Sequence, residues 1–362
     1  MRADRLRRVR TAMAAQRCDL LALPPGDDFL YLAGFAPLRD ERACVLLVGA
    51  GGEALLVPRV NAAQVESRLP VRLFTYNDTQ GPFAALEAAL RSVGDRLEAV
   101  AVGDDMRADH LLLMQQALPG ARFLPASRLL APMRMRKDPA EIEALRRAAA
   151  TADAGVLAAA EACRPGTSER EVAAAAAGAI RGAGADAVGF AIVASGPNSA
   201  FPHHEPTNRR LRVGEAVLLD VGGRRDGYCS DITRMVFLGE PTPKYREVHA
   251  LVEEAVRAAL GVIRPDVPVA EVDRAARGVI ARAGYGEFFI HRTGHGLGLT
   301  AHEPPSVVDT DATRLQEGMV FSVEPGIYLP GEFGVRLEDI VVVTQHGPEI
   351  LSRLPRGLLR SA

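Results

Sequence analysis

Residues 216–238 read AVLLDVGGRRDGYCSDITRMVFL, and this stretch decides the fold. Two apolar runs, Ala216–Val221 and Thr233–Leu238, have the length and composition of strands. Between them lie paired glycines and the dipeptide Asp226-Gly227, which is a strong hairpin signal. The stretch therefore predicts two neighbouring antiparallel strands.

Two aspartates in this hairpin occupy positions where an ordinary strand is apolar. Asp220 ends the first run just before Val221, and Asp231 lies on the returning strand. A lone ionised carboxylate is costly to bury unless a cation or a dense set of donors compensates its charge. The hairpin brings Asp220 and Asp231 side by side, where two carboxylates repel each other unless a proton or a metal ion lies between them.

A second acidic set follows further along the chain. Glu324 comes directly after the apolar run Met319–Val323, and Glu338 lies within the predicted strand Val335–Val343. His295 has a glycine on each side, which permits close approach of the backbone. The acid-bearing strand pair of the first stretch thus recurs, with a histidine nearby.

The charges of this constellation favour a pair of metal ions. Four carboxylates match two divalent cations, and one imidazole completes the ligand set. Oxygen-rich ligation with a single histidine suits Mn²⁺, Co²⁺ or Zn²⁺ better than copper or an iron–sulfur cluster. Any one acid taken alone is more commonly a cap, a turn residue or an ion-pair partner, and Asp339 and Glu332 are assigned to that structural class.

The length of 362 residues predicts two domains, with limits of 1–130 and 138–362. The first third alternates strand-like and helix-like segments and is predicted to be an α/β domain. Its strands are expected at 44–48, 54–57, 100–102 and 122–124, and its helices at 84–93 and 108–118. A helix at the very start is expected to bury Leu6, Val9, Met13 and Leu20.

The second domain is predicted to be α+β, with helices outside a largely antiparallel sheet. Asp138 with Glu141 and Ser168 with Glu171 form capping boxes that begin two helices, one ending near Ala162 and one running through the Ala-rich stretch to Ala177. After a strand at 187–194 and the hairpin, two more helices are expected at 245–263 and 269–283. A helix pair followed by an acid-bearing strand pair therefore occurs twice.

The composition excludes several classes of function. The chain has 43 basic and 45 acidic residues, a net charge of −2, which argues against a nucleic acid or an anionic membrane as partner. Its four cysteines form no C-x-x-C pair, so reduced buried thiols are expected. No apolar run approaches the roughly 18 residues of a membrane span. We expect a soluble, cytoplasmic protein.

Five segments resemble the pita-bread metallopeptidases, specifically their Xaa-Pro dipeptidase (prolidase) and Xaa-Pro aminopeptidase branch. The resemblance covers about Asp138 to Leu354, and the first third resembles the creatinase-type N-terminal domain only loosely. The segments are SGPNSAFPHH at 195–204, LDVGG at 219–223 with YCSDITR at 228–234, HRTGHGLGLTAHE at 291–303, VEPGIY at 323–328 and GVRLED at 334–339.

The resemblance implies the role of each site residue. The implied metal ligands, of which Asp231 and Glu338 would bridge both ions, are Asp220, Asp231, His295, Glu324 and Glu338. His203 and His302 would contact the substrate and stabilise the developing oxyanion, an arrangement in which imidazole N–H groups are suitable donors. His291 and Arg336 would line the proline pocket, with Arg336 also a candidate partner of the acids. His204 is expected to be exposed, and Thr233 and Tyr228 are expected to donate to the ligands.

The expected activity is hydrolysis of an Xaa-Pro bond in a short peptide, with Glu324 moving a proton from water to the proline nitrogen. A dipeptidase is favoured, and Arg42 is one candidate for reading the free carboxylate, unless it is a solvated turn residue. The alternatives are an Xaa-Pro aminopeptidase and, from another class, a non-catalytic peptide-binding module. The long N-terminal domain argues against a methionine aminopeptidase, and the complete ligand set argues against the metal-free creatinase. The resemblance also suggests a homodimer.

Overall fold

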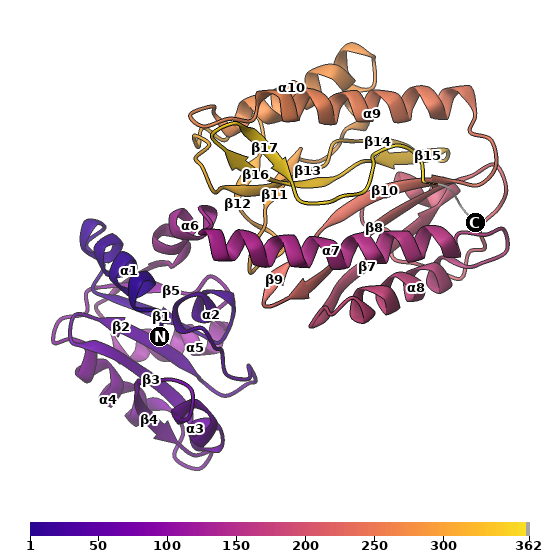
Figure 1. The fold of residues 1–362 in the computed structure, drawn as a ribbon. Coiled ribbons are helices and arrows are strands. Elements are labelled where there is room, and N and C mark those ends of the chain that lie inside the picture. The colour runs from indigo at the N-terminus through magenta and orange to yellow at the C-terminus, as the bar shows by residue number, and fades with distance from the viewer. Residues whose placement is uncertain (360–362) are drawn as a thin grey trace. The chain divides into compact units, whose positions relative to one another are not determined.

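The computed structural model describes residues 1–359, and the chain divides into two compact units. The first ends at Arg134, and the second begins at Met135. Figure 1 shows both units, each with its own sheets and helices. Among the residues described, no helix combines the length and the apolar character that a membrane span requires.

The first unit is built on a six-stranded mixed sheet with strand order β4-β3-β2-β1-β5-β6. An apolar core lies between this sheet and the helices α4 and α5. The α/β prediction for this part is confirmed. The strands are β1 (Leu20–Leu23), β2 (Val45–Gly49), β3 (Gly52–Pro58), β4 (Arg72–Tyr76), β5 (Ala99–Val102) and β6 (Arg122–Pro125), and the helices are α1 (Ala3–Ala15), α2 (Asp27–Ala33), α3 (Arg59–Glu66), α4 (Phe83–Val93), α5 (Ala108–Ala117) and α6 (Ser127–Met135).

One expectation for the first helix is wrong. Leu6, Val9 and Met13 are buried on α1 as predicted, but Leu20 belongs to the central strand β1. Arg17 adopts a φ of 51°, in the left-handed region, which a continuing α-helix does not allow. The chain therefore leaves the helix before Leu20 and enters the sheet.

The second unit is α+β, and its strands pair in an antiparallel manner within two larger sheets and one small one. Helices α7 and α8 pack on the sheet that contains β7 and β8, while α9 and α10 cover the sheet that contains β13, and Figure 1 shows the two helix pairs on opposite outer faces. The helices are α7 (Pro139–Ala162), α8 (Glu169–Gly182), α9 (Pro243–Val262) and α10 (Val269–Arg282), with short 3-10 turns η1 (Gly196–Ala200) and η2 (Gly286–Phe288). Both predicted capping boxes, at Asp138 and Ser168, are present.

The strands of this unit follow the predicted double pattern of a helix pair and an acid-bearing strand pair. The first sheet has the order β10-β8-β7 with β9 paired to β8, the second has the order β12-β11-β13-β16-β17, and β14 pairs with β15. The bounds are β7 (Ala187–Ser195), β8 (Ala216–Arg225), β9 (Tyr228–Cys229), β10 (Ile232–Phe237), β11 (Gly294–Gly296), β12 (Glu303–Val307), β13 (Val320–Val323), β14 (Gly326–Leu329), β15 (Phe333–Arg336), β16 (Asp339–Thr344) and β17 (Gly347–Ile350).

The predicted hairpin forms with a tight turn. Asp226 and Gly227 have φ angles of 52° and 82°, the pair of positive values that matches the twist of the flanking strands. Asp220 pairs across the sheet with Thr233, which places Asp231 just before β10 and close to Asp220.

The predicted strand Val335–Val343 is instead two strands in different sheets. β15 pairs with β14, and β16 pairs with β13, so the chain changes sheet at Leu337 and Glu338. The Glu338 amide donates to the Thr233 carbonyl oxygen at 3.2 Å, which holds the crossing against β10. This change of sheet places Glu338 between the β14-β15 pair and the sheet of β13 and β16, next to β10.

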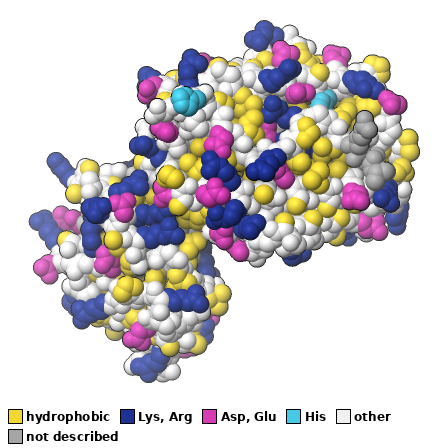
Figure 2. All heavy atoms as spheres, viewed as in Figure 1, with side chains coloured by type: hydrophobic (Ala, Val, Ile, Leu, Met, Phe, Trp, Pro, Cys, Tyr) yellow, Lys and Arg dark blue, Asp and Glu magenta, His cyan; other side chains and the backbone are white. Residues whose placement is uncertain are grey.

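The cysteines and the surface charges agree with the sequence. Cys18, Cys44, Cys163 and Cys229 are all buried free thiols, as predicted. Figure 2 shows acidic and basic side chains interspersed over the visible face, which fits a chain with almost balanced charge.

Candidate active site

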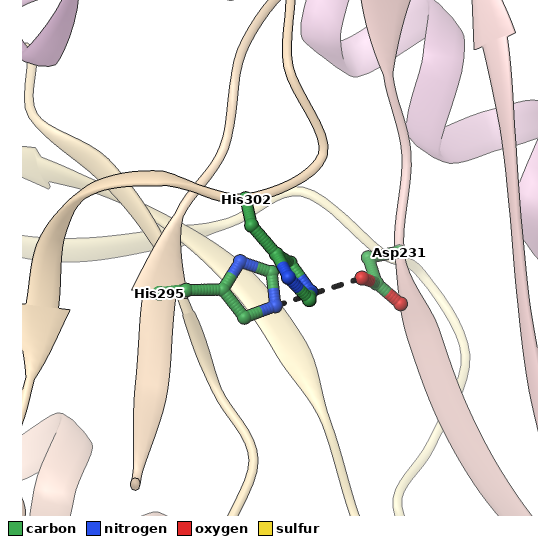
Figure 3. A group of neighbouring side chains, drawn as sticks. All are labelled: Asp231, His295 and His302. Atoms are coloured by element: carbon green, nitrogen blue, oxygen red, sulfur yellow. Dashed lines mark ion pairs between the residues drawn. The ribbon is translucent and has the colours of Figure 1, made fainter. Parts of the chain in front are cut away.

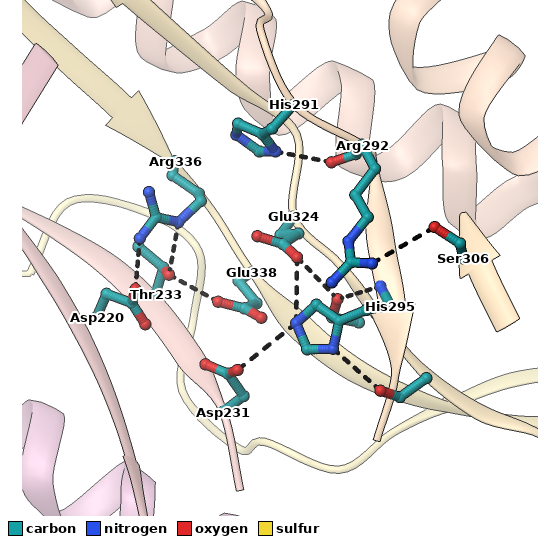
Figure 4. Close-up of polar contacts among 12 residues, drawn as sticks. Asp220, Asp231, Thr233, His291, Arg292, His295, Ser306, Glu324, Arg336 and Glu338 are labelled. Carbon is teal, nitrogen blue, oxygen red and sulfur yellow. Dashed lines mark hydrogen bonds and ion pairs between the residues drawn. The ribbon is translucent and has the colours of Figure 1, made fainter. Parts of the chain in front are cut away.

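Five predicted ligand residues from five separate segments converge in the second unit (Figure 4). Potential ligand atoms of Asp220, Asp231 and Glu338 lie within 4.8 Å of one another, and so do those of His295, Glu324 and Glu338. Glu338 is shared by both groups because the crossing between β15 and β16 brings it to the centre. The structure thus brings together every residue that the sequence nominated as a ligand.

The carboxylates of this cluster strongly disfavour their own negative charge. Burial, followed by the neighbouring Glu338, Asp220 and Glu324, raises the pKa of Asp231 well above its usual range. Burial and the same kind of repulsion raise the pKa of Glu338, and burial raises the pKa of Glu324 to about 7. Such a cluster requires protons or bound cations to remain together.

His295 is arranged to offer one nitrogen as a ligand. Its Nδ1 atom lies 3.0 Å from the Gly296 carbonyl oxygen, which can only accept, so Nδ1 carries the proton. Burial lowers the pKa of His295 to about 3, which keeps the ring neutral. The Nε2 lone pair therefore faces Glu324 Oε1 at 3.3 Å and Asp231 Oδ2 at 3.7 Å, an arrangement that a cation between them would stabilise.

Two buried oxygen atoms of the cluster, Oδ1 of Asp220 and Oε1 of Glu338, have no hydrogen-bond partner within residues 1–359. Buried polar atoms are rarely left unsatisfied, because their lost hydration must be replaced. Oxygen atoms of this kind, with a single imidazole, form a donor set that hard or borderline divalent ions accept. The residues present therefore fit a metal centre.

Arg336 connects the metal cluster to the predicted substrate pocket. It donates to Asp220 Oδ2, to Thr233 Oγ1 at 3.1 Å and to the Tyr328 hydroxyl at 2.9 Å. The Tyr328 hydroxyl lies 2.8 Å from His291 Nε2, and His291 Nδ1 lies 2.7 Å from the Arg292 carbonyl oxygen. Because that carbonyl can only accept, Tyr328 donates to His291, and one chain of hydrogen bonds runs from Asp220 to His291.

His203 and His302 lie at the edge of the cluster, and both are exposed. The ring of His302 lies 4.0 Å from the ring of His295, and Figure 3 shows it beside Asp231. Nitrogen and oxygen atoms of Asp231, His295 and His302 also come within 4.8 Å of one another. Partial loss of hydration at the ring, and then the neighbouring Arg292 and His203, lower the pKa of His302. The ring is thus favoured in its neutral form, which still offers one N–H.

A cavity of about 450 Å³ opens over the cluster. The nine site residues predicted in the second unit all line it, namely His203, Asp220, Asp231, His291, His295, His302, Glu324, Arg336 and Glu338. The cavity is large enough for a dipeptide and small enough to surround one.

Four further lining residues were not predicted from the sequence, Phe190, Ile192, Pro202 and Arg292. Phe190 and Ile192 are two residues apart on β7, and Ile192 is the cross-strand neighbour of Asp220. Residues two apart on a strand lie on the same face, so their spacing could have predicted two cavity-lining residues if β7 had been expected to pair with β8. Arg292 stands next to His291 in a quoted segment, so its position in the motif was the available signal.

Other predicted side chains have clear structural partners. Asp339 pairs with Arg234 and Arg356, and Glu332 pairs with Lys244, so their structural assignment is confirmed. Thr233 donates to the predicted ligand Glu338 at 2.7 Å as expected, while the Tyr228 hydroxyl donates to Glu141 at 2.9 Å.

Two further side chains already have polar partners. His204 is half-buried rather than exposed, because its ring bonds to Glu169. Arg42, in the first unit, hydrogen-bonds Asp78, Asp40 and Glu41.

Two family models match the chain. Residues 143–345 match the model described as metallopeptidase family M24, and residues 5–136 match the creatinase/prolidase N-terminal domain. The two matches correspond to the two halves of the sequence.

Known proteins resemble the chain over nearly its whole length. It is 41% identical to the probable dipeptidase PepE of Mycobacterium tuberculosis, over 94% of this chain and 91% of that protein. It is 33% identical to the Xaa-Pro dipeptidase of Pyrococcus horikoshii, over 98% of this chain and 99% of that one. A crystal structure of prolidase from Thermococcus sibiricus superimposes with a TM-score of 0.94 at 35% identity, with 98% of each chain covered.

Proposed function

Because the chain belongs to metallopeptidase family M24, we propose that it is an Xaa-Pro dipeptidase, which hydrolyses the peptide bond before proline in short peptides. The observation that carries this proposal is the site itself: four carboxylates and one neutral imidazole converge beneath a cavity of about 450 Å³. The name of the Xaa-Pro dipeptidase of Pyrococcus horikoshii supports this substrate class, and the name of the probable dipeptidase PepE supports action on dipeptides.

Asp220, Asp231, His295, Glu324 and Glu338 would hold the metal ions, with Asp231 and Glu338 shared between two of them. When bound, such ions supply a water of lowered pKa and a polarised scissile carbonyl group. The oxygen-rich donor set favours Mn²⁺, with Co²⁺ or Zn²⁺ as alternatives. The two orphan oxygen atoms, on Asp220 and Glu338, support direct ligation by these carboxylates.

The residues around the centre would move protons and orient the substrate. Glu324, which lines the cavity with Oε1 3.3 Å from His295 Nε2, would accept a proton from water and return it to the proline nitrogen. His203 and His302 would donate to the carbonyl oxygen as negative charge develops on it. Arg336 and His291 would shape the pocket for the pyrrolidine ring, which has no N–H to satisfy.

A dipeptidase must also recognise a free carboxylate close to the scissile bond. Arg292 lines the cavity, and among the described residues its guanidinium makes only a long hydrogen bond of 3.4 Å to Ser306 Oγ. Its guanidinium is therefore available to a carboxylate, whereas that of Arg336 is engaged by Asp220. Arg42, the cation proposed from the sequence, is already bonded to three carboxylates and is the weaker candidate.

A peptide panel tests the proposal. Metal-stripped protein, with and without added Mn²⁺, is assayed on Ala-Pro, Ala-Pro-amide, Ala-Pro-Ala-Ala and Ala-Ala. Metal-dependent cleavage of Ala-Pro, with little cleavage of the amide, supports the dipeptidase. Preference for Ala-Pro-Ala-Ala would instead make the protein an Xaa-Pro aminopeptidase, and peptide binding without cleavage would indicate a non-catalytic module.

The domain limits, the cellular location and the oligomeric state are also part of the proposal. We propose that residues 1–130 form the creatinase-like N-terminal domain and residues 138–362 the catalytic domain. We also propose a cytoplasmic location, as expected from the composition of the chain, and a homodimer, as the sequence resemblance suggests; cell fractionation and light scattering test them.

A further inference from the structure

His203 lies on a segment with little secondary structure of its own. Between η1, which ends at Ala200, and β8, which begins at Ala216, the chain forms only turns and one isolated bridge. Phe201, two residues before His203, is 60% exposed. A side chain that must aim an N–H at a reacting carbonyl needs its backbone fixed from elsewhere.

One buried carboxylate provides such an anchor. Glu169 begins α8, and its side chain has no exposed surface. Its Oε1 accepts from the Ser195 amide and hydroxyl, both at 2.8 Å, and from the Asn198 side chain at 2.9 Å.

The second oxygen of the same carboxylate holds the far end of the segment. Oε2 lies 2.9 Å from His204 Nε2 and accepts from the Thr207 amide at 3.0 Å and the Thr207 hydroxyl at 2.7 Å. Glu169 thus accepts hydrogen bonds from both sides of His203, at residues 195 and 198 before it and at residues 204 and 207 after it.

The charge of Glu169 is favoured by these contacts. Burial alone would raise its pKa, but hydrogen bonds from His204, Asn198 and Thr207 outweigh burial and lower the pKa to about 2. Its place in the first turn of α8 adds the favourable field of the helix N-terminus. The anchor is therefore an ionised carboxylate at neutral pH.

The segment is also fixed from the side of the metal cluster. Arg336 donates to the Pro202 carbonyl oxygen at 3.3 Å, directly before His203. Arg209 donates to Ser195 Oγ at 2.8 Å and pairs with Glu215, which supports the start of the segment. His203 therefore lies between an anchor at Arg336 and an anchor at Glu169.

We propose that Glu169 is a positioning residue, which holds segment 195–207 so that His203 presents its imidazole to the substrate carbonyl. This inference rests on the proposed function, because it assumes that His203 acts on a peptide. Glu169 does not itself line the cavity, so its effect on turnover must pass through His203.

A double-mutant cycle tests the coupling. Glu169→Gln keeps the size of the side chain but replaces one acceptor oxygen with an NH₂ group that faces donors. We expect this substitution to lower kcat on Ala-Pro by tenfold or more with Mn²⁺ content retained. In the His203→Ala background, the same substitution should change kcat by less than twofold, because the group it positions is already gone.

Glu205→Gln is the matched control, since Glu205 is an exposed glutamate in the same segment. It should leave kcat and KM unchanged. Equal losses from Glu169→Gln with and without His203 would overturn the positioning role and indicate general destabilisation. An unchanged kcat in the single Glu169→Gln variant would overturn it as well.

Amide hydrogen exchange provides a readout that does not depend on activity. Glu169→Gln should speed exchange within residues 196–207 and leave β13 and β16 unchanged. If the wild-type protein cleaves no Xaa-Pro peptide, the proposed function fails, and exchange alone decides on Glu169. Local loosening then supports its holding role, and unchanged exchange contradicts it.

Discussion

The Thr233 hydroxyl donates to Glu338 Oε2 at 2.7 Å, and the other carboxylate oxygen of Glu338 has no hydrogen-bond partner in the part of the chain that the structure describes. This pairing fixes the direction in which the free oxygen points. We predict that Thr233→Val lowers Mn²⁺ affinity by about 10- to 100-fold, as loss of groups that orient ligands generally does. Isothermal titration calorimetry of the metal-stripped protein with Mn²⁺ measures this affinity.

The control for Thr233→Val is Thr344→Val, on the outer end of β16, where the hydroxyl donates to the Gly347 carbonyl oxygen. That variant should bind Mn²⁺ as the wild-type protein does. Unchanged affinity in Thr233→Val would show that Glu338 is oriented by other contacts.

Asp231→Asn should have opposite effects on activity and on stability. Burial and Glu338 raise the pKa of Asp231, so folding of the metal-free protein must protonate this side chain, whereas asparagine is neutral without a proton; the substitution should therefore stabilise the metal-free protein. Metal loading and Ala-Pro hydrolysis should be lost together. Thermal unfolding with and without Mn²⁺, beside metal analysis, checks both effects, and an active variant would remove Asp231 from the ligand set.

Recognition of the substrate carboxylate should depend on Arg292. We expect Arg292→Met to raise KM for Ala-Pro by about tenfold, equivalent to roughly 1.4 kcal/mol, with a smaller effect on Ala-Pro-Ala-Ala. Arg42→Met is the comparison, because Arg42 was the cation proposed from the sequence. If Arg42→Met alone raises KM, the carboxylate is read by Arg42 and the assignment to Arg292 is wrong.

The stability of the protein should depend on the ionisation of Glu169. Its pKa is lowered to about 2 in the folded protein, from an ordinary 4.5, so its contribution is fully present above pH 4.5 and is lost as the pH falls towards 2. We expect Glu169→Gln to destabilise the chain by about 2 kcal/mol at pH 7 and by much less at pH 3. Urea unfolding at both pH values measures this, and a difference independent of pH would contradict it.

Much of the site could be predicted because its residues stand out from their immediate neighbours in the sequence. An aspartate within an apolar strand, as at Asp220, is costly unless it is compensated, so it indicates a ligand before any fold is known. The hairpin turn at Asp226-Gly227 and the capping boxes at Asp138 and Ser168 are decided by neighbouring residues, and all of them form as expected.

What could not be predicted depends on contacts between distant segments. The change of sheet at Glu338 is fixed by its bond to Thr233, more than 100 residues away, and nothing near Glu338 signals it. Glu169 has the local pattern of an ordinary helix start, and its role emerges only when residues 195–207 fold over it. The partial burial of His204 could not be predicted either, because it depends on the contact of its ring with Glu169, 35 residues earlier in the chain.

Titration of metal-stripped protein with Mn²⁺, followed by Ala-Pro hydrolysis, decides whether the carboxylate cluster is a catalytic metal centre. We predict that the stripped protein is inactive and that hydrolysis rises to saturation as two ions bind per chain. Full hydrolysis of Ala-Pro by the stripped protein, or no hydrolysis with two ions bound, would contradict it.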